Sequence, residues 1–126
     1  MPIELTELQL AIIRVLWSRG EATVSVVHEE AMPERGLALT TVATVLTRLE
    51  KAGLVARRQV GRHYSYRALV SEEEVRRSMV SGLAERLFHG DLTALVSHLL
   101  AEGDIGSGDL ERVRRLIDQK QRHKEG

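Results

Sequence analysis

The sequence predicts a mainly α-helical chain with one short β-hairpin near its middle. Apolar residues recur at helical spacing along most of the 126 residues, and the repeats begin at residues that commonly cap helices. One stretch, "LVARRQVGRHYSYRAL", instead alternates every second residue on both sides of Gly61. That alternation is typical of two strands joined by a tight turn.

The first two helices are marked by their caps. Thr6 is predicted to cap the first helix in a capping box with Gln9, and Gly20 is suited to end it in the left-handed region. Thr23 is predicted to cap a short second helix. This helix should end near Pro33, because the residue before a proline is pushed out of the α region.

A third helix is predicted from a cap at Thr40 to Gly53, and it is rich in threonine. Threonine is a mediocre helix former because its branched Cβ restricts the side chain, so these residues need another explanation. At about 100° per residue, the valines and leucines fall on one side of the helix and a polar set falls on the other. We call this polar set the threonine face; it consists of Thr41, Thr44, Thr47, Arg48 and Lys51. Short hydroxyl and methyl groups flanked by cations suit a helix in a DNA major groove, so we expect these residues to bind DNA.

Basic residues surround the predicted turn of the hairpin: Arg57, Arg58, Arg62 and His63. Three helices closed by a basic hairpin form the order of a winged helix-turn-helix, in which the hairpin is the wing. We expect Arg57, Arg58 and Arg62 to contact the DNA backbone. The alternative is that these arginines protect an exposed edge strand from aggregation.

The formal net charge of zero hides an uneven distribution of charged residues. Residues 40–70 contain six Lys or Arg against one Asp or Glu, whereas residues 1–39 contain three against six and residues 71–126 contain nine against eleven. A local excess of about five positive charges lies in the third helix and the hairpin. Such an asymmetry is expected of a surface that binds a polyanion; the alternative is that these residues form ordinary solvated faces.

Three further helices are predicted after the hairpin. Ser71 and Glu74 form a second capping box, Asp91 caps a fifth helix, and the last helix begins at Ser107 or Asp109. We therefore divide the chain into a winged helix-turn-helix domain, residues 1–70, and a helical domain, residues 71–126.

The helical domain is expected to mediate dimerisation. Three amphipathic helices of this size bury too little surface to be stable alone, and a second copy of the chain is the simplest partner. In the alternative, the stripe of the fifth helix packs wholly on the N-terminal domain and the protein is a monomer. The apolar positions predicted to form the dimer interface are Val75, Met79, Leu83, Leu92, Leu95, Val96, Leu99, Leu110, Val113, Leu116 and Ile117.

Several classes of protein are not expected. The chain has no cysteine, and no apolar run approaches the roughly 18 residues that span a bilayer, so we expect a soluble, cytoplasmic protein without membrane insertion. The five histidines lie in separate segments without helical ligand spacing, so neither a metal nor a cofactor is expected. Neither a glycine-rich phosphate loop nor a nucleophile elbow is present, and we do not expect an enzyme.

Four segments together resemble the penicillinase-repressor, or BlaI/MecI-type, family of transcriptional regulators: "LTELQLAIIRVLW", "TTVATVLTRLEKAGLV", "GRHYSYRALVS" and "EEVRRSMVSGLAERLFHGDLTALVSHLL". The resemblance extends from about Leu5 to Lys120. It implies a dimeric repressor with an N-terminal winged helix and a C-terminal helical dimerisation domain, bound to a pseudo-palindromic operator in double-stranded DNA. It also implies a DNA-binding role for the threonine face and for Arg62.

The same resemblance suggests how repression could be relieved. Members of the family are often cut within the dimerisation helices by a membrane-bound sensor protease, between an asparagine and a phenylalanine, and the family is associated with the response to β-lactams. The matching position here reads His98-Leu99, so the chain departs from that pattern. Cleavage near His98 and Leu99 is therefore a hypothesis. The alternative function is a winged-helix protein–protein interaction module that docks its basic helix on an acidic partner.

Overall fold

The computed structural model describes residues 2–103 and 105–125. Within them the chain is mainly helical, with six α-helices and a small antiparallel sheet of three strands. The chain divides into two compact units, Met1–Gly82 and Leu83–Gly126. The mainly helical winged-helix fold predicted from the sequence is confirmed.

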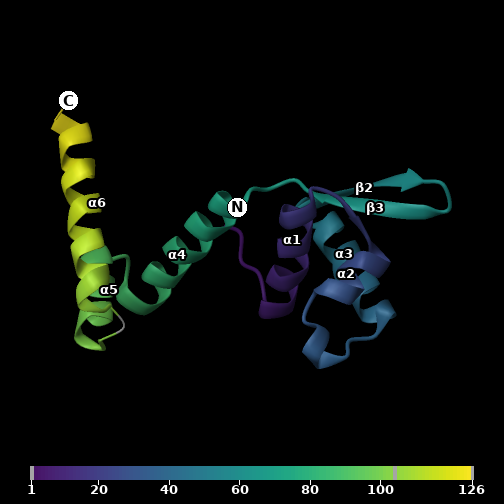
Figure 1. Cartoon of the computed structure of the whole chain (residues 1–126), viewed down its shortest axis with the longest axis horizontal. Helices are drawn as coiled ribbons and strands as arrows, with labels where there is room; N and C mark the ends of the chain where they lie inside the picture. Colours follow the sequence, from purple (N-terminus) through teal and green to yellow (C-terminus); the bar gives the residue numbers. More distant parts are fainter. Residues whose placement is uncertain (1, 104, 126) are drawn as a thin grey trace. The chain divides into compact units, whose positions relative to one another are not determined.

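Three helices precede the hairpin in the first unit, and the first two begin directly after their predicted caps, Thr6 and Thr23. Helix α1 spans Glu7–Arg19, α2 spans Val24–Glu30 and α3 spans Leu39–Lys51. The capping box at the start of α1 is present, because the Gln9 amide donates to Thr6 Oγ1 and the Thr6 amide donates to the Gln9 side chain. A single turn of 3-10 helix, Pro33–Arg35, connects α2 to α3. Figure 1 shows these helices gathered at the base of the hairpin.

The hairpin consists of β2, Val55–Val60, and β3, His63–Ala68, which pair antiparallel with Val60 opposite His63. Gly61 lies in the connecting turn with φ of 62°, a left-handed conformation that glycine adopts without strain. A two-residue strand, β1 at Ala22–Thr23, adds to the other edge of β3 and gives the order β1-β3-β2. The sequence did not predict β1, because two residues are too short to show a period.

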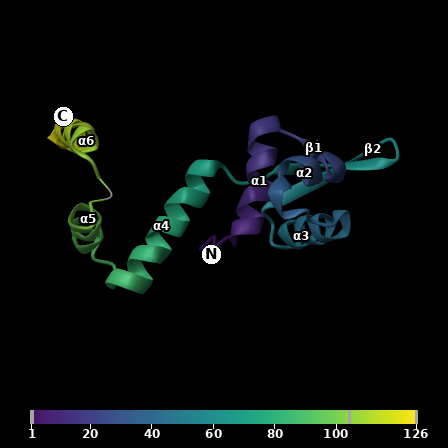
Figure 2. The same ribbon diagram turned by 60° about the horizontal axis from the view of Figure 1, so that its bottom comes forward.

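The core of the first unit lies between the three helices and the base of the sheet (Figure 2). The largest side chains that are fully buried there come from α1, α2, α3 and β2, and they are Ile12, Ile13, Leu16, Val27, Val42, Leu46, Leu49 and Val55. Tyr66 of β3 is buried with them. These contacts hold α3 by its apolar side and leave its other side to the solvent.

Helix α4, Glu72–Phe88, begins inside the first unit. Val75 is only 2% exposed and belongs to the core, against which Met79 also packs. Two hydrogen bonds also connect the start of α4 to the first unit. The Trp17 indole donates to the Val70 carbonyl at 2.9 Å, and the Ile3 amide donates to Ser78 Oγ at 2.6 Å. The assignment of Val75 to a dimer interface is therefore wrong, since its side chain is already covered by its own chain. Met79 is partly covered in the same way.

The second unit contains the end of α4, helix α5 at Leu92–Ala101 and helix α6 at Ser107–Glu125. Asp91 caps α5 as predicted, because the Ala94 amide donates to its carboxylate at 3.1 Å. Many large apolar side chains remain exposed on these helices, among them Leu83, Leu87, Leu92, Val96, Leu99, Leu100, Leu110, Leu116 and Ile117. None of the helices described is both long and apolar enough to cross a membrane.

Candidate nucleic-acid interface

The two sides of α3 differ as the sequence predicted. Val42, Leu46 and Leu49 are at most 1% exposed and face the core. All the residues of the threonine face are exposed to solvent. The predicted geometry of the helix is thus confirmed, and DNA binding by this face remains a prediction.

The start of α3 differs from the prediction. The helix begins at Leu39, and its N-cap is Ala38, which has an extended backbone and no side chain that could accept a hydrogen bond. Thr40 already lies within the first turn, so its assignment as the cap is wrong. The first amides of α3 consequently have no side-chain cap. Uncapped amides and the positive end of the helix dipole favour a bound anion such as a phosphate group.

Two hydroxyls of the threonine face are bonded to the helix itself. Thr44 Oγ1 donates to the Thr40 carbonyl at 2.9 Å, and Thr47 Oγ1 donates to the Ala43 carbonyl at 3.0 Å. The Thr41 hydroxyl makes no such bond within the residues that the structure describes. The three threonines are therefore chemically different, although they share one side of the helix.

The cations of the threonine face are available to a ligand. Arg48 and Lys51 lie in the last turn of α3 and are exposed. Among residues 2–103 and 105–125, neither forms an ion pair. Their positive charge is thus not neutralised by a carboxylate of the described chain.

The arginines of β2 are engaged within the protein. Arg57 lies 3.2 Å from the Glu50 carboxylate of α3, and its guanidinium stands 4.3 Å from the centre of the Tyr64 ring. A hydrogen bond to Tyr66 and the charge of Glu50 raise the pKa of Arg57. Arg57 therefore connects the wing to the end of α3, a contact that the sequence did not predict.

Arg58 is held from the other side of the wing. Its Nε and Nη2 atoms donate to the two oxygens of Glu21 at 2.5 and 3.0 Å. This hydrogen bond lowers the pKa of Glu21 below its usual value of 4.5, so the carboxylate is charged at neutral pH. Glu21 and Arg58 are 37 residues apart in the sequence, and no local pattern reveals such a pair. Arg57 and Arg58 are thus not free cations in the unbound protein.

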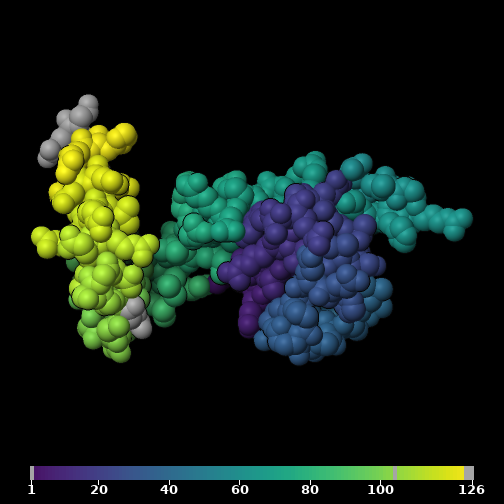
Figure 3. Space-filling model, in the orientation of Figure 1, coloured from purple at the N-terminus to yellow at the C-terminus, as the bar shows by residue number. Residues whose placement is uncertain are grey.

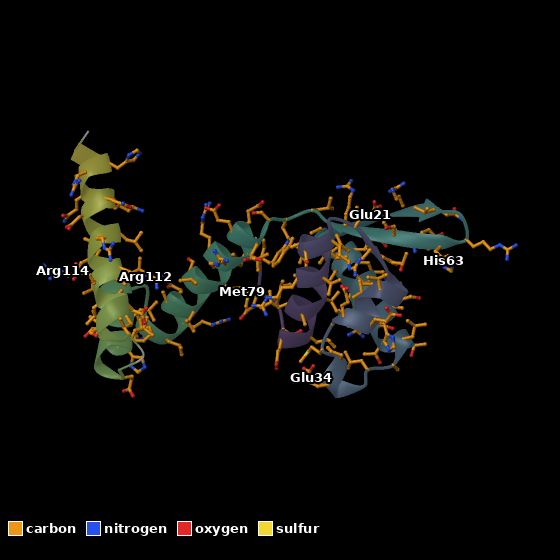
Figure 4. All side chains as sticks on the ribbon, in the orientation of Figure 1. Glu21, Glu34, His63, Met79, Arg112 and Arg114 are labelled. Carbon is orange, nitrogen blue, oxygen red and sulfur yellow. The ribbon has the colours of Figure 1, made fainter. Side chains whose placement is uncertain are left out.

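The end of the wing is free of such contacts. Figure 3 shows the hairpin extending beyond the helices of the first unit, and Figure 4 shows His63 near its turn and Glu21 near its base. The side chains of Arg62 and His63 are exposed and have no ion pair in the described part of the chain. The predicted site is therefore divided between a free set, the threonine face with Arg62, and a restrained set, Arg57 and Arg58.

The turn before α3 is also fixed by a side chain. His28 of α2 donates from Nε2 to the carbonyl of Leu37 at 2.6 Å. Met32 and Gly36, at the two ends of the 3-10 turn, have left-handed backbones with φ of 50° and 58°. His28 thereby restrains the approach of the chain to α3. The sequence pattern predicted no specific role for this histidine.

The described residues near this surface include several that could bind an anion. Across the described residues, no three His, Cys, Asp or Glu side chains are grouped as a metal site requires. The arrangement offers hydroxyls, exposed cations and helix amides on a rigid support. This set of groups can bind a polyanion, and it provides no nucleophile paired with a base.

The chain is similar to known regulators over almost its whole length. Residues 5–119 match the sequence model of the family described as penicillinase repressor. The transcriptional regulator BlaI of Mycobacterium tuberculosis is 36% identical over 115 residues, which cover 90% of this chain and 82% of that protein. The methicillin resistance regulatory protein MecI of Mammaliicoccus sciuri is 21% identical over 117 residues, or 93% of this chain and 95% of that protein.

A solved structure is similar in fold. The solution structure of the DNA-binding domain of the repressor BlaI superposes with a TM-score of 0.51 and 22% identity. The match covers 59% of this chain and 93% of that domain. At this level of identity the likeness concerns the fold of the winged helix.

Proposed function

Because the chain belongs to the penicillinase repressor family, we propose that it is a dimeric transcriptional repressor that binds a pseudo-palindromic operator. Helix α3 lies in the major groove, and the wing contacts the backbone beside it. The observation that carries this proposal is the threonine face of α3. It is exposed, carries two unpaired cations and is held from behind by Val42, Leu46 and Leu49.

The charges of this surface support DNA as the ligand. Arg48 and Lys51 lie at one end of α3, and the uncapped amides with their partial positive charge lie at the other, so groups that attract anions stand on both sides of the threonines. Hydroxyls and methyls between cations can meet base edges while the cations reach guanine or phosphate. Arg62 extends the positive surface to the wing.

Exposed apolar side chains support dimerisation through the second unit. Leu92 is 60% exposed, Leu116 is 63% exposed and Ile117 is 51% exposed. Apolar side chains at this density on short helices favour a protein partner. Two copies of the chain would cover each other's helices and place two α3 helices on neighbouring half-sites of DNA. The proposed interface keeps the predicted positions on α5 and α6 and the exposed end of α4, without Val75.

We propose further that proteolysis of the repressor in the cytoplasm releases it from the operator. A membrane sensor protease would cut α5 near His98 and Leu99, which are both exposed on this helix. Loss of the end of α5 and of all of α6 would separate the dimer and lower the affinity for a two-part operator. Induction by β-lactams would follow if such a protease senses them. Mass spectrometry of the protein from induced cells would detect a fragment that ends at His98.

Binding to the DNA upstream of the chain's own gene tests the main proposal. We expect footprinting to reveal a protected, pseudo-palindromic site and sedimentation to reveal a dimer on it. The same mobility-shift assay with random duplexes of equal length, at about 0.15 M salt, measures non-specific binding. The repressor proposal fails if no upstream sequence is bound better than random DNA. An interaction module would then be the better description, because it predicts little DNA affinity and no footprint.

A further inference from the structure

We infer that Thr44 and Thr47 contact the operator bases as hydrogen-bond acceptors or through their methyl groups, and that Thr41 is the donor of the threonine face. The inference rests on the proposed function and assigns a separate role to each threonine. It follows from the hydrogen bonds that the free protein already makes.

A threonine hydroxyl has one hydrogen to donate and two lone pairs that accept. A backbone carbonyl only accepts, so the contacts from Thr44 Oγ1 to the Thr40 carbonyl and from Thr47 Oγ1 to the Ala43 carbonyl use the hydroxyl hydrogens. Each oxygen keeps acceptor capacity for a partner outside the helix. Thr44 and Thr47 cannot donate to DNA unless they first break these bonds.

The same bonds restrain the side chains. A threonine in a helix chooses between two rotamers, and bonding to the carbonyl four residues earlier selects one of them. Because the oxygen and the methyl share the Cβ atom, fixing the oxygen also fixes the methyl. Thr44 and Thr47 thus offer a preset pair of groups, an acceptor and a methyl, on an exposed surface.

Thr41 differs because of its position in the chain. The carbonyl four residues before it belongs to Leu37, which precedes the helix and accepts a bond from His28 Nε2 at 2.6 Å. The helix that supplies partners to Thr44 and Thr47 therefore supplies none to Thr41. Its hydroxyl is free to donate.

The major groove offers different partners to a hydroxyl that accepts and to one that donates. Its hydrogen-bond donors are the amino groups of adenine and cytosine, and its acceptors are N7 and O6 of guanine, N7 of adenine and O4 of thymine. Thr44 and Thr47 match the amino groups and the thymine methyl, and they do not match guanine or phosphate oxygens. Thr41 matches a guanine acceptor or a phosphate at the start of α3.

Base analogues in the duplex protected by footprinting test the assignment. Purine replaces adenine and 2-pyrimidinone replaces cytosine, each to remove one amino group; 7-deazaguanine replaces guanine to remove N7, and uracil replaces thymine to remove one methyl. A methylphosphonate removes one phosphate charge. Dissociation constants are measured by fluorescence anisotropy for the wild type and for Thr44→Val, Thr47→Val and Thr41→Val, with Thr→Ser at each position to retain the hydroxyl without the methyl.

We expect Thr44→Val and Thr47→Val to weaken native binding by roughly three- to tenfold where the oxygen is the contact. That loss should disappear on the duplex that lacks the matching amino group. Where the methyl is the contact, the Thr→Val variant keeps that methyl and should bind like the wild type. The Thr→Ser variant should bind the native duplex more weakly than the wild type does, and it should bind the uracil duplex as well as the wild type does. For Thr41→Val, the loss of affinity should instead disappear on a duplex that carries 7-deazaguanine or a methylphosphonate; we call such a disappearance coupling.

The inference is overturned if Thr44 or Thr47 is coupled to 7-deazaguanine or a methylphosphonate, or to none of the analogues. It is also overturned if Thr41→Val is coupled only to an amino-group analogue. Circular dichroism of each variant confirms that the helices are retained. If the wild type shows no preference for any upstream duplex, the proposed function itself fails, which is a distinct result.

Discussion

Glu21 holds Arg58 of the wing in the free protein, so the substitution Glu21→Gln should tighten DNA binding. The two carboxylate oxygens accept from Arg58 Nε and Nη2 at 2.5 and 3.0 Å, which occupies one edge of the guanidinium. Glutamine is neutral and offers one oxygen, so it competes poorly with a phosphate. The low pKa of Glu21 means that the wild-type carboxylate is charged at every pH used for DNA binding.

The expected gain follows from counterion release. Each phosphate that a cation neutralises changes the slope of log K against log salt by about −0.9, which corresponds to roughly fivefold in affinity at about 0.15 M salt. Two wings in the proposed dimer would change the slope by about −1.8 and the affinity by roughly thirtyfold. A smaller gain would indicate that Arg58 reaches phosphate with only part of its guanidinium.

Fluorescence anisotropy across a series of salt concentrations measures both quantities. Glu111→Gln on α6 is the matched control, because it makes the same change of charge on an exposed residue outside the proposed surface. We expect the control to bind like the wild type. A steeper slope for Glu21→Gln supports the account. An unchanged slope, or weaker binding, would refute it and show that the ion pair presents Arg58 to DNA.

The division of α4 and the surface carboxylates give two further predictions. Val75→Ala should lower the free energy of unfolding of the first unit by about 1–3 kcal/mol in urea, because it removes buried methyl groups. Leu116→Asp should leave that unfolding transition unchanged but abolish the dimer in sedimentation. The opposite pattern would contradict the assignment of Val75 to the core and of Leu116 to the dimer interface. Arg58 and Arg19 lower the pKa values of Glu21 and Glu30 in the folded protein, so their stabilising effect is present above about pH 4.5 and lost as the pH falls further. In urea unfolding the wild type should therefore be more stable than Glu21→Gln plus Glu30→Gln at neutral pH, and this difference should shrink as the pH falls below about 4.5. Equal stability of the two proteins at neutral pH would argue against these ion pairs.

Local signals predicted most of the fold. The capping boxes at Thr6 and Ser71 and the glycine turn at Gly61 depend on neighbours within a few residues, and all three are present. Thr40 failed as a cap because several residues near it were compatible with a helix start, and the helix extends to Leu39. The sequence pattern alone could not decide which of them would be helical.

The parts that the sequence missed depend on contacts between distant residues. Val75 has the spacing expected of an amphipathic helix, and only the folded core reveals which apolar surface covers it. The pairing of Arg57 with Glu50 likewise arises when β2 comes beside α3, and that of Arg58 with Glu21 when β2 comes near the residue before β1. The sequence thus predicted which basic residues lie on this surface, but it did not predict that Arg57 and Arg58 form ion pairs within the protein.

The most direct test of the account is Arg48→Ala combined with Lys51→Ala. We expect this variant to lose specific binding to the protected upstream duplex, by roughly tenfold or more for each cation that contacts a base, while circular dichroism and dimerisation remain unchanged. The control, Arg115→Ala plus Arg122→Ala, removes the same charge from exposed residues that lie opposite the apolar stripe of α6, and it should bind normally. Wild-type affinity in the Arg48 and Lys51 variant would contradict DNA recognition by the threonine face, and loss of folding would contradict its exposure.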